Sequence, residues 1–419
     1  MKYIKNHYLI ILNSIFFFSS FLFIILSKRL IFDDINNLRD ILRYNSEGLT
    51  IETIKNHINP AAPLSYIIIS LIGTLFGAKL WSWRLAVLLG WIILYLSLAL
   101  NKNLQKKSNA IFFVITACFY SATASASILT EIYGLVFLTL GIIYYFFLNR
   151  KDNNNEIFAF LFFGLAIICR QYYLCLIPAL FFTEFNFKQF KLSNRPFIVF
   201  IKYSLILLPI ILLFLLWGGL TSPSLKSFAS YTNVNTLVSF NPIRILPPII
   251  YIGIYLGPLY LIHYGLGKNK KTQLYFLIFA SLIAIIFVLN NDYFYRLGNQ
   301  EQGTGPLDSI GAKLNNNITL KTFLFLTYTS GFYFFIYLVN LLKSLINNPF
   351  QKFTLFFILF FVLENIGIGG NISFYERYIL QLMPVFAISL ILVNNFKKHL
   401  FILLTLTFLI GQLMLWRHL

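Results

Sequence analysis

Long apolar segments alternate with short polar ones along the whole chain. Windows of about 17–25 mostly apolar residues recur from the N-terminal region to the C-terminal region. A helix of that length crosses a hydrocarbon core of about 30 Å, and the segments are continuously apolar rather than alternating, which argues against a barrel. Because backbone groups in lipid must be bonded within the spanning structure, the pattern predicts helices. We therefore predict an all-α, polytopic membrane protein.

The basic residues set the orientation of the predicted helices. Lys2 and Lys5 precede the first span, which places the N-terminus in the cytoplasm and residues 28–81 in an outer loop. Residues 64–77 of this loop are apolar but short for a crossing. If they did cross, the basic cluster 102–107 would lie outside, against the positive-inside rule. We therefore expect interfacial helices, and no span, within residues 28–81.

With that choice, the later basic clusters all fall on the cytoplasmic side. No repeat, Pro-rich linker or charge run divides the chain, so residues 1–419 are expected to form one integral membrane unit. The predicted spans, about 13 in all, cover residues 8–27, 82–100, 110–127, 133–148, 156–169, 172–185, 197–217, 243–263, 272–290, 320–342, 353–367, 377–394 and 399–416.

Composition narrows the class of protein further. Hydrophobic residues make up 58% of the chain and charged residues only 11%, which is too apolar for a soluble domain. The net charge of +19 would suit a nucleic-acid-binding protein, but Lys and Arg occur in short clusters between apolar segments rather than in a basic stripe. Cys118, Cys169 and Cys175 all lie in apolar stretches, where they suit neither a disulfide framework nor a zinc site.

The chain has only 14 acidic residues, and several fall beside basic ones on the predicted outer side. Ionisable groups near apolar segments are costly, so they usually have partners or a function. Each also has a structural explanation, as a solvated loop, a helix cap or an interfacial arginine. His57 and His263 are isolated and expected to be structural, and no comparable set of paired acids is expected on the other side. The outer set includes Asp33, Asp34, Glu131, Arg170, Gln171, Asp292, Arg296, Glu376 and Arg377.

These residue types suit one reaction. A carboxylate at the outer interface can take a proton from an acceptor hydroxyl, and an arginine can hold the phosphate of a lipid-linked donor. Nucleotide donors are cytoplasmic and would face the wrong side. Asp33 and Asp34 are adjacent, so they cannot flank one bond as a retaining pair. The residues therefore predict inverting transfer of a sugar from a polyprenyl-phosphate carrier.

The order of the motifs resembles the multi-spanning GT-C glycosyltransferases, most of all the dolichyl-phosphate-glucose α-1,2-glucosyltransferases. The Pro63-to-Tyr66 element and the Arg377-Tyr378…Pro384 pattern also look like bacterial aminoarabinose- and mannose-transferring relatives. The matching elements, in chain order, are Asp33-Asp34, Pro63-Leu64-Ser65-Tyr66, Thr130-Glu131, Cys169-Arg170-Gln171, Gly218-Gly219 and Tyr375-Glu376-Arg377-Tyr378.

The resemblance implies a GT-C-like fold and transfer of a hexose, such as glucose, from a polyprenyl- or dolichyl-phosphate carrier to a glycan or lipid-linked acceptor. Asp33 and Asp34 would be catalytic, with Asp33 as general base. Glu131, Gln171 and Tyr66 would bind acceptor or sugar, and Arg170 and Arg377 would bind the donor phosphate. The reaction would require no cofactor or metal ligand, although two adjacent acids could hold a divalent metal.

The site would face the periplasm of a bacterial inner membrane or the lumen of the endoplasmic reticulum. Two other functions remain open from the sequence. A transporter or lipid-linked glycan flippase would also have many spans and buried charges, but it tends to show internal repeats and mid-membrane acids. A glycan polymerase or ligase would also need outer arginines, and it usually carries a larger outer loop than residues 290–319.

Overall fold

The chain divides into two compact units, unit 1 (Met1–Asn235 with Met383–Leu419) and unit 2 (Thr236–Leu382). The polypeptide leaves unit 1 after the first 235 residues and returns to it for the last two helices. The computed structural model describes residues 6–30, 34–59, 61–148, 153–186, 191–192, 196–219, 222–224, 245–265, 270–289, 317–367, 376–393 and 397–417.

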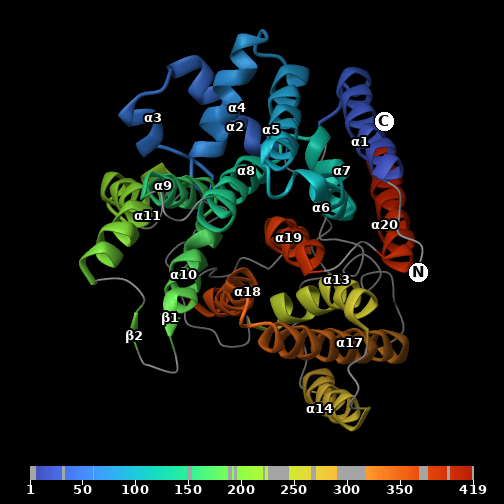
Figure 1. Ribbon diagram of the computed structural model, residues 1–419. Helices are drawn as coiled ribbons and strands as arrows, with labels where there is room; N and C mark the ends of the chain where they lie inside the picture. The colour runs from blue at the N-terminus through green and yellow to red at the C-terminus, as the bar shows by residue number, and fades with distance from the viewer. Residues whose placement is uncertain are drawn as a thin grey trace. The chain divides into compact units, whose positions relative to one another are not determined.

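The described part of unit 1 is helical apart from one minimal strand pair, β1 (Phe185–Asn186) and β2 (Lys191–Leu192), which run antiparallel. Three helices, α2 (Asp34–Glu47), α3 (Ile51–Lys55) and α4 (Leu64–Leu75), form the first loop and lie together beside one end of α5 (Figure 1). The others are α1 (Asn6–Leu26), α5 (Leu80–Leu100), α6 (Ser108–Thr116), α7 (Phe119–Ala126), α8 (Glu131–Ile142), α9 (Asn153–Cys169), α10 (Leu176–Glu184), α11 (Pro196–Trp217), α19 (Met383–Val393) and α20 (Lys398–Trp416).

The first and last helices of unit 1 are joined by polar side chains within otherwise apolar helices. On α1, the Ser19 hydroxyl donates to the Gln412 side-chain oxygen of α20 at 2.6 Å. The same hydroxyl accepts a hydrogen bond from the Trp416 indole at 2.7 Å. Such bonds hold membrane helices together because lipid offers polar groups no alternative partner.

The helices described in unit 2 are α13 (Leu246–Tyr264), α14 (Lys270–Leu289), α17 (Asn317–Ser344), α18 (Pro349–Gly367) and the 3-10 helix η7 (Glu376–Leu382). Two of them, α13 and α17, pack through glycines. Gly253 and Gly257 of α13 are four residues apart and face α17, where a side chain on Gly253 would overlap the carbonyl of Gly331. Small residues at this spacing let the helix backbones touch.

The predicted all-α membrane class is confirmed. Six described helices are long and apolar enough to cross a membrane: Asn6–Leu26, Leu80–Leu100, Leu246–Tyr264, Lys271–Val288, Ile318–Ser344 and Lys398–Trp416. The pair Gln105–Thr116 and Tyr120–Ala126, bent by 92°, would be a seventh, so the predicted span 110–127 is broken in its middle. Other predicted spans correspond to shorter apolar helices, including Glu131–Phe147, Asn154–Cys169, Ile201–Trp217 and Tyr378–Leu392.

Helix α4 is shorter than a membrane span. Its 12 residues extend about 18 Å at 1.5 Å per residue, against a hydrocarbon core of about 30 Å. The chain turns back into α5 through Gly77 (φ +97°) and Ala78 (φ +51°), and Gly73 leaves room for the Trp83 ring of α5. That residues 64–77 do not cross the membrane stays a prediction.

Candidate functional site

The first buried acid, Asp34, begins α2 and pairs with an arginine of α5. Its Oδ2 lies 2.8 Å from Arg84 Nη2, and both side chains are fully buried. Arg84 also donates to the backbone carbonyls of Ser27, at 2.9 Å, and Arg29, just after α1. The pair therefore ties together the end of α1, the start of α2 and the first turns of α5.

Two side chains of α2 hold both backbone groups of Ile128, in the segment between α7 and α8. The Ile128 amide donates to Asp34 Oδ1 at 2.7 Å, and its carbonyl accepts from Asn37 Nδ2 at 2.6 Å. Asp34 and Asn37 lie three residues apart, which puts them on the same face of a helix. Because Ile128 lies two residues before Thr130, this clamp sets where α8 begins.

The second buried acid, Glu131, is the first residue of α8. Its Oε1 lies 2.7 Å from Arg170 Nη2, and the side chains are 2% and 10% exposed. The same Arg170 nitrogen donates to the Thr130 hydroxyl at 2.6 Å. The N-terminus of a helix carries partial positive charge, so Glu131 is stabilised by α8 as well as by Arg170. The sequence placed these two residues on one side, and the structure brings them into contact.

Gly134 explains how Arg170 reaches Glu131. A Cβ at Gly134, one turn into α8, would lie 2.9 Å from the Tyr173 ring and 3.7 Å from Arg170 Cγ. The backbone of Arg170 is extended, with φ −149° and ψ 114°, between α9 and a 3-10 turn. The arginine stem therefore lies along a face of α8 that has no side chain at this position.

Tyr66 and Gln171 join the first loop to the same place. The Tyr66 hydroxyl, fully buried on α4, donates to Asn37 Oδ1 at 3.1 Å and lies close to the Thr130 side chain. Gln171 Oε1 accepts from the backbone amide of Ala62 at 3.1 Å. Three predicted binding residues, Tyr66, Glu131 and Arg170, therefore surround one point, and Gln171 anchors the neighbouring backbone.

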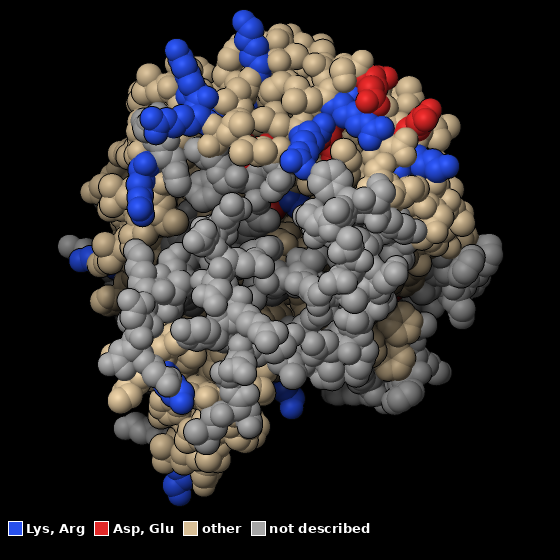
Figure 2. Space-filling view, turned by 180° about the vertical axis from the view of Figure 1, so that it is seen from behind, with Lys and Arg blue, Asp and Glu red and all other residues tan. Residues whose placement is uncertain are grey.

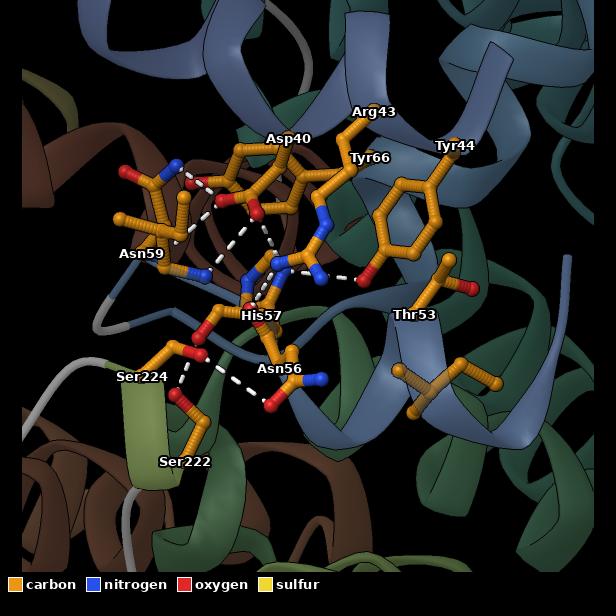
Figure 3. A network of polar contacts seen from close by, with 12 residues as sticks. Asp40, Arg43, Tyr44, Thr53, Asn56, His57, Asn59, Tyr66, Ser222 and Ser224 are labelled. Carbon is orange, nitrogen blue, oxygen red and sulfur yellow. Dashed lines mark hydrogen bonds and ion pairs between the residues drawn. The ribbon is translucent and has the colours of Figure 1, made fainter. Parts of the chain in front are cut away.

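A polar network that the sequence did not predict lies within the first loop (Figure 3). The Asp40 carboxylate of α2 accepts from the backbone amides of Ile58 and Asn59, both at 2.9 Å, and from the Asn59 side chain. His57 Nδ1 lies 3.2 Å from Asp40 Oδ1. Burial alone would raise the pKa of Asp40, but the bond and charge of His57, with the bonds from Ile58 and Asn59, hold that pKa below its usual value.

The His57 side chain is fully buried and surrounded by polar and aromatic neighbours, as a structural histidine would be. Its Nε2 lies 2.9 Å from the Ala61 carbonyl, which can only accept, so this nitrogen carries a proton. Its Nδ1 lies 2.9 Å from the Tyr44 hydroxyl. The Trp217 ring lies parallel to the imidazole at 6.3 Å, and the Tyr66 ring meets it edge-on at 4.9 Å.

The chain after α11 returns to this network. Gly218 (φ +65°) and Gly219 turn the backbone at the end of the helix. The Trp217 indole donates to the Ile54 carbonyl at 3.0 Å, and the Ser222 hydroxyl donates to the His57 carbonyl. The Ser224 hydroxyl donates to Asn56 Oδ1 at 3.2 Å (Figure 3). The Gly-Gly motif therefore turns the chain back onto the first loop.

Two predicted site residues have no described side chain. Asp33 lies outside the described residues. The backbone of Arg377 belongs to η7 in unit 2, but its side chain lies outside the described part. The catalytic role of Asp33 and the phosphate-binding role of Arg377 remain predictions.

One expectation was wrong: paired acids also occur away from the predicted outer side. Lys202 Nζ of α11 lies 2.7 Å from Glu156 of α9 and 3.9 Å from Glu184 of α10. Tyr145, in the π-helix Ile143–Phe147 that follows α8, donates to Glu184. Glu156, Glu184 and Lys202 are far apart in sequence, so only the helix packing joins them. No group of three or more potential metal-ligating His, Cys, Asp or Glu side chains occurs among the described residues.

The end of unit 1 that carries the first loop is rich in basic side chains. Toward the top of Figure 2, Lys and Arg are spread over the surface, with acidic side chains gathered at one side. Such a surface attracts anionic ligands and lipids. The exposed basic residues of the first loop are Lys28, Arg29, Arg39, Lys55 and Lys79.

The fold and its buried charges define a multi-spanning, all-α membrane protein. No family model matches the chain, and no curated protein matches it either. A comparison with solved structures finds the crystal structure of ArnT from Cupriavidus metallidurans in the apo state. The two share 11% identity over 97% of this chain and 76% of that one, with a TM-score of 0.41. A likeness this weak identifies neither family nor function.

Proposed function

We propose that the protein is a GT-C-type glycosyltransferase, which moves a hexose from a polyprenyl-phosphate carrier to a glycan or lipid-linked acceptor. The observation that carries this proposal is the buried Glu131–Arg170 pair, with Tyr66 beside it, at the end of unit 1 covered by the first loop. A cation, a carboxylate and a phenol meeting there can hold a phosphate and sugar hydroxyls together. The order of the sequence motifs supports the same reaction class.

Within this proposal, Asp33 is the general base and Asp34 positions it. Both oxygens of Asp34 are already engaged, by Arg84 and by the Ile128 amide, and the side chain is fully buried. A carboxylate bound in this way is a poor proton acceptor for a substrate hydroxyl. Arg170 holds the donor phosphate, with Arg377 as a second candidate, and the reaction takes place on the periplasmic or lumenal side.

The reaction consists of one displacement. The acceptor oxygen forms a bond to the anomeric carbon as the bond from that carbon to the phosphate oxygen breaks. The acceptor proton passes to Asp33, and the polyprenyl phosphate leaves with its charge held by Arg170. One attack from the face opposite the leaving group inverts the configuration.

The test is transfer by the purified protein in detergent. Polyprenyl-phosphate-linked glucose and mannose serve as donors, and mass spectrometry of the products identifies the sugar and the acceptor. We expect Asp33→Asn to lower the transfer rate by about 10²-fold or more while the protein stays folded, because it removes the base. Glu47→Gln, which changes an exposed acid of α2, should leave the rate unchanged. Full activity of Asp33→Asn would show that this residue is not the base.

Transport is a second candidate, favoured by one observation. Charged networks occur toward both ends of α8 and α9, Glu131–Arg170 at one and Glu184–Lys202–Glu156 at the other. A flippase or transporter could use such groups on its two sides. Transport needs two compartments, whereas transfer does not, so turnover in detergent separates the two functions. A polymerase or ligase would instead move a whole glycan, which the same mass spectra would reveal.

A further inference from the structure

The two buried acid–arginine pairs of unit 1 differ in how completely their carboxylates are bonded. Asp34 uses one oxygen for Arg84 and the other for the Ile128 amide. Glu131 Oε1 lies 2.7 Å from Arg170 Nη2 in an ion pair, but neither of its buried carboxylate oxygens has a hydrogen-bond partner among the described residues. A buried acceptor left without a donor destabilises the fold. A pair with only a structural role would be expected to satisfy both oxygens, as the Asp34 pair does.

The position of Glu131 favours a negative charge, whichever group carries it. Glu131 is the first residue of the 12-residue helix α8, where the helix dipole stabilises anions. Phosphate groups bind at such helix ends for the same reason. The protein's own carboxylate therefore lies at a place where a phosphate would be equally well stabilised.

Arg170 is held in position independently of Glu131. Its guanidinium donates to the Thr130 hydroxyl, and its stem lies against Gly134. Thr130 is in turn placed by the Ile128 clamp of α2. If another anion replaced the carboxylate, these contacts would keep the guanidinium in place.

We propose that the Glu131 carboxylate occupies the position that an anionic group of the ligand takes at Arg170. Ligand binding then exchanges one ion pair for another: the Arg170–Glu131 contact opens and an Arg170–phosphate contact forms. The released carboxylate can accept hydrogen bonds from the sugar or the acceptor. That this anion is the phosphate of a lipid-linked donor rests on the proposed function. The competition between Glu131 and an anion for Arg170 does not depend on that function.

This exchange has a consequence for turnover. A lipid phosphate is present in the donor and again in the product, so an arginine free to hold it tightly would be slow to release it. A carboxylate that competes for the same guanidinium weakens both complexes and displaces the product phosphate. Glu131 is in this sense a positioning residue that sets the affinity of Arg170 for the lipid phosphate.

The test measures binding to the purified full-length protein in detergent by titration calorimetry. The probes are farnesyl phosphate, a short prenyl phosphate, and inorganic phosphate, with farnesol as the uncharged control. We expect Glu131→Gln to bind both phosphates about tenfold more tightly than the unaltered protein, because a competing charge is removed. Arg170→Gln should lose this binding, and the double variant should behave like Arg170→Gln. Glu52→Gln, an exposed acid of α3, should change nothing.

The outcomes separate the inference from the proposed function. If Glu131→Gln binds neither phosphate more tightly, the inference is overturned, whatever the transfer assay shows. If it binds inorganic phosphate more tightly but no variant prefers farnesyl phosphate, the exchange stands and the lipid-phosphate donor is wrong. If Glu131→Gln does not fold, Glu131→Asp replaces it, because it withdraws the charge by one methylene. A gain of about threefold is then expected, and no gain overturns the inference.

Discussion

The described part of unit 1 contains two buried acid–arginine pairs that are bonded differently. Asp34 and Arg84 join three segments of backbone, and both oxygens of the acid are used. Glu131, at the start of α8, forms an ion pair with Arg170, but neither oxygen of the acid has a hydrogen-bond partner among the described residues. Burial and charge alone therefore do not mark a functional residue. The bonding of each oxygen separates a structural pair from a candidate binding site.

The largest effect is expected from breaking the Asp34 pair. Arg84→Met would leave a buried carboxylate without its cation and should lower the free energy of unfolding by about 3–5 kcal/mol. Arg170→Met should lower it by about 1–3 kcal/mol, since the α8 N-terminus still stabilises Glu131. Thermal unfolding in detergent gives the order of the two variants. Adding Asp34→Asn to Arg84→Met should recover part of the loss, and equal losses for the two arginines would contradict the distinction between the pairs.

A smaller loss of stability is expected from substitution of Asn37, which lies between the two pairs. Asn37→Ala removes the donor to the Ile128 carbonyl and the acceptor of the Tyr66 hydroxyl, and should destabilise the protein by about 1–3 kcal/mol. The matched control is Asn45→Ala on the same helix, where the amide meets Thr74 at the surface. If both substitutions have the same small effect on thermal unfolding, the Ile128 clamp contributes nothing specific.

The smallest effect is expected from substitution of Thr130, which lies beside the Glu131–Arg170 pair. Thr130→Val keeps the shape of the side chain but removes the hydroxyl that Arg170 contacts. The loss should be about 1 kcal/mol of stability, and farnesyl phosphate should bind a few-fold more weakly because the guanidinium is less well held. Thr53→Val, which removes a hydroxyl within the α3 cap, should reduce stability without changing phosphate binding. Unchanged phosphate binding by Thr130→Val would show that Thr130 does not help to position Arg170.

The hydrophobic pattern predicted the fold class and placed most helices within a few residues, because long apolar runs leave few alternatives in lipid. It missed the break between α6 and α7, since the run around Cys118 stays apolar through the bend. It also missed the close contact of Gly253 with Gly331, although the spacing of Gly253 and Gly257 was a readable signal.

The candidate site was predicted in part. Glu131 and Arg170 are 39 residues apart by their numbers and meet in space. The sequence had assigned both to the outer side, which is compatible with this contact. Arg84 was missed because a lone arginine inside a predicted span gives no indication of its partner. Asp40 was missed because it looks like one more loop acid. Its three donors on Ile58 and Asn59, and its contact with His57, form only when α2 packs against residues 57–59. Lys202 and its two glutamates depend on three-dimensional packing in the same way.

The bond between Ser19 and Gln412 has a consequence for how the protein is made. The two residues are 393 positions apart, so α1 receives this partner only after α20 has been synthesised and inserted. Until α20 is inserted, the Ser19 hydroxyl cannot form its hydrogen bonds with Gln412 and Trp416. A chain truncated before α20 would expose that hydroxyl permanently.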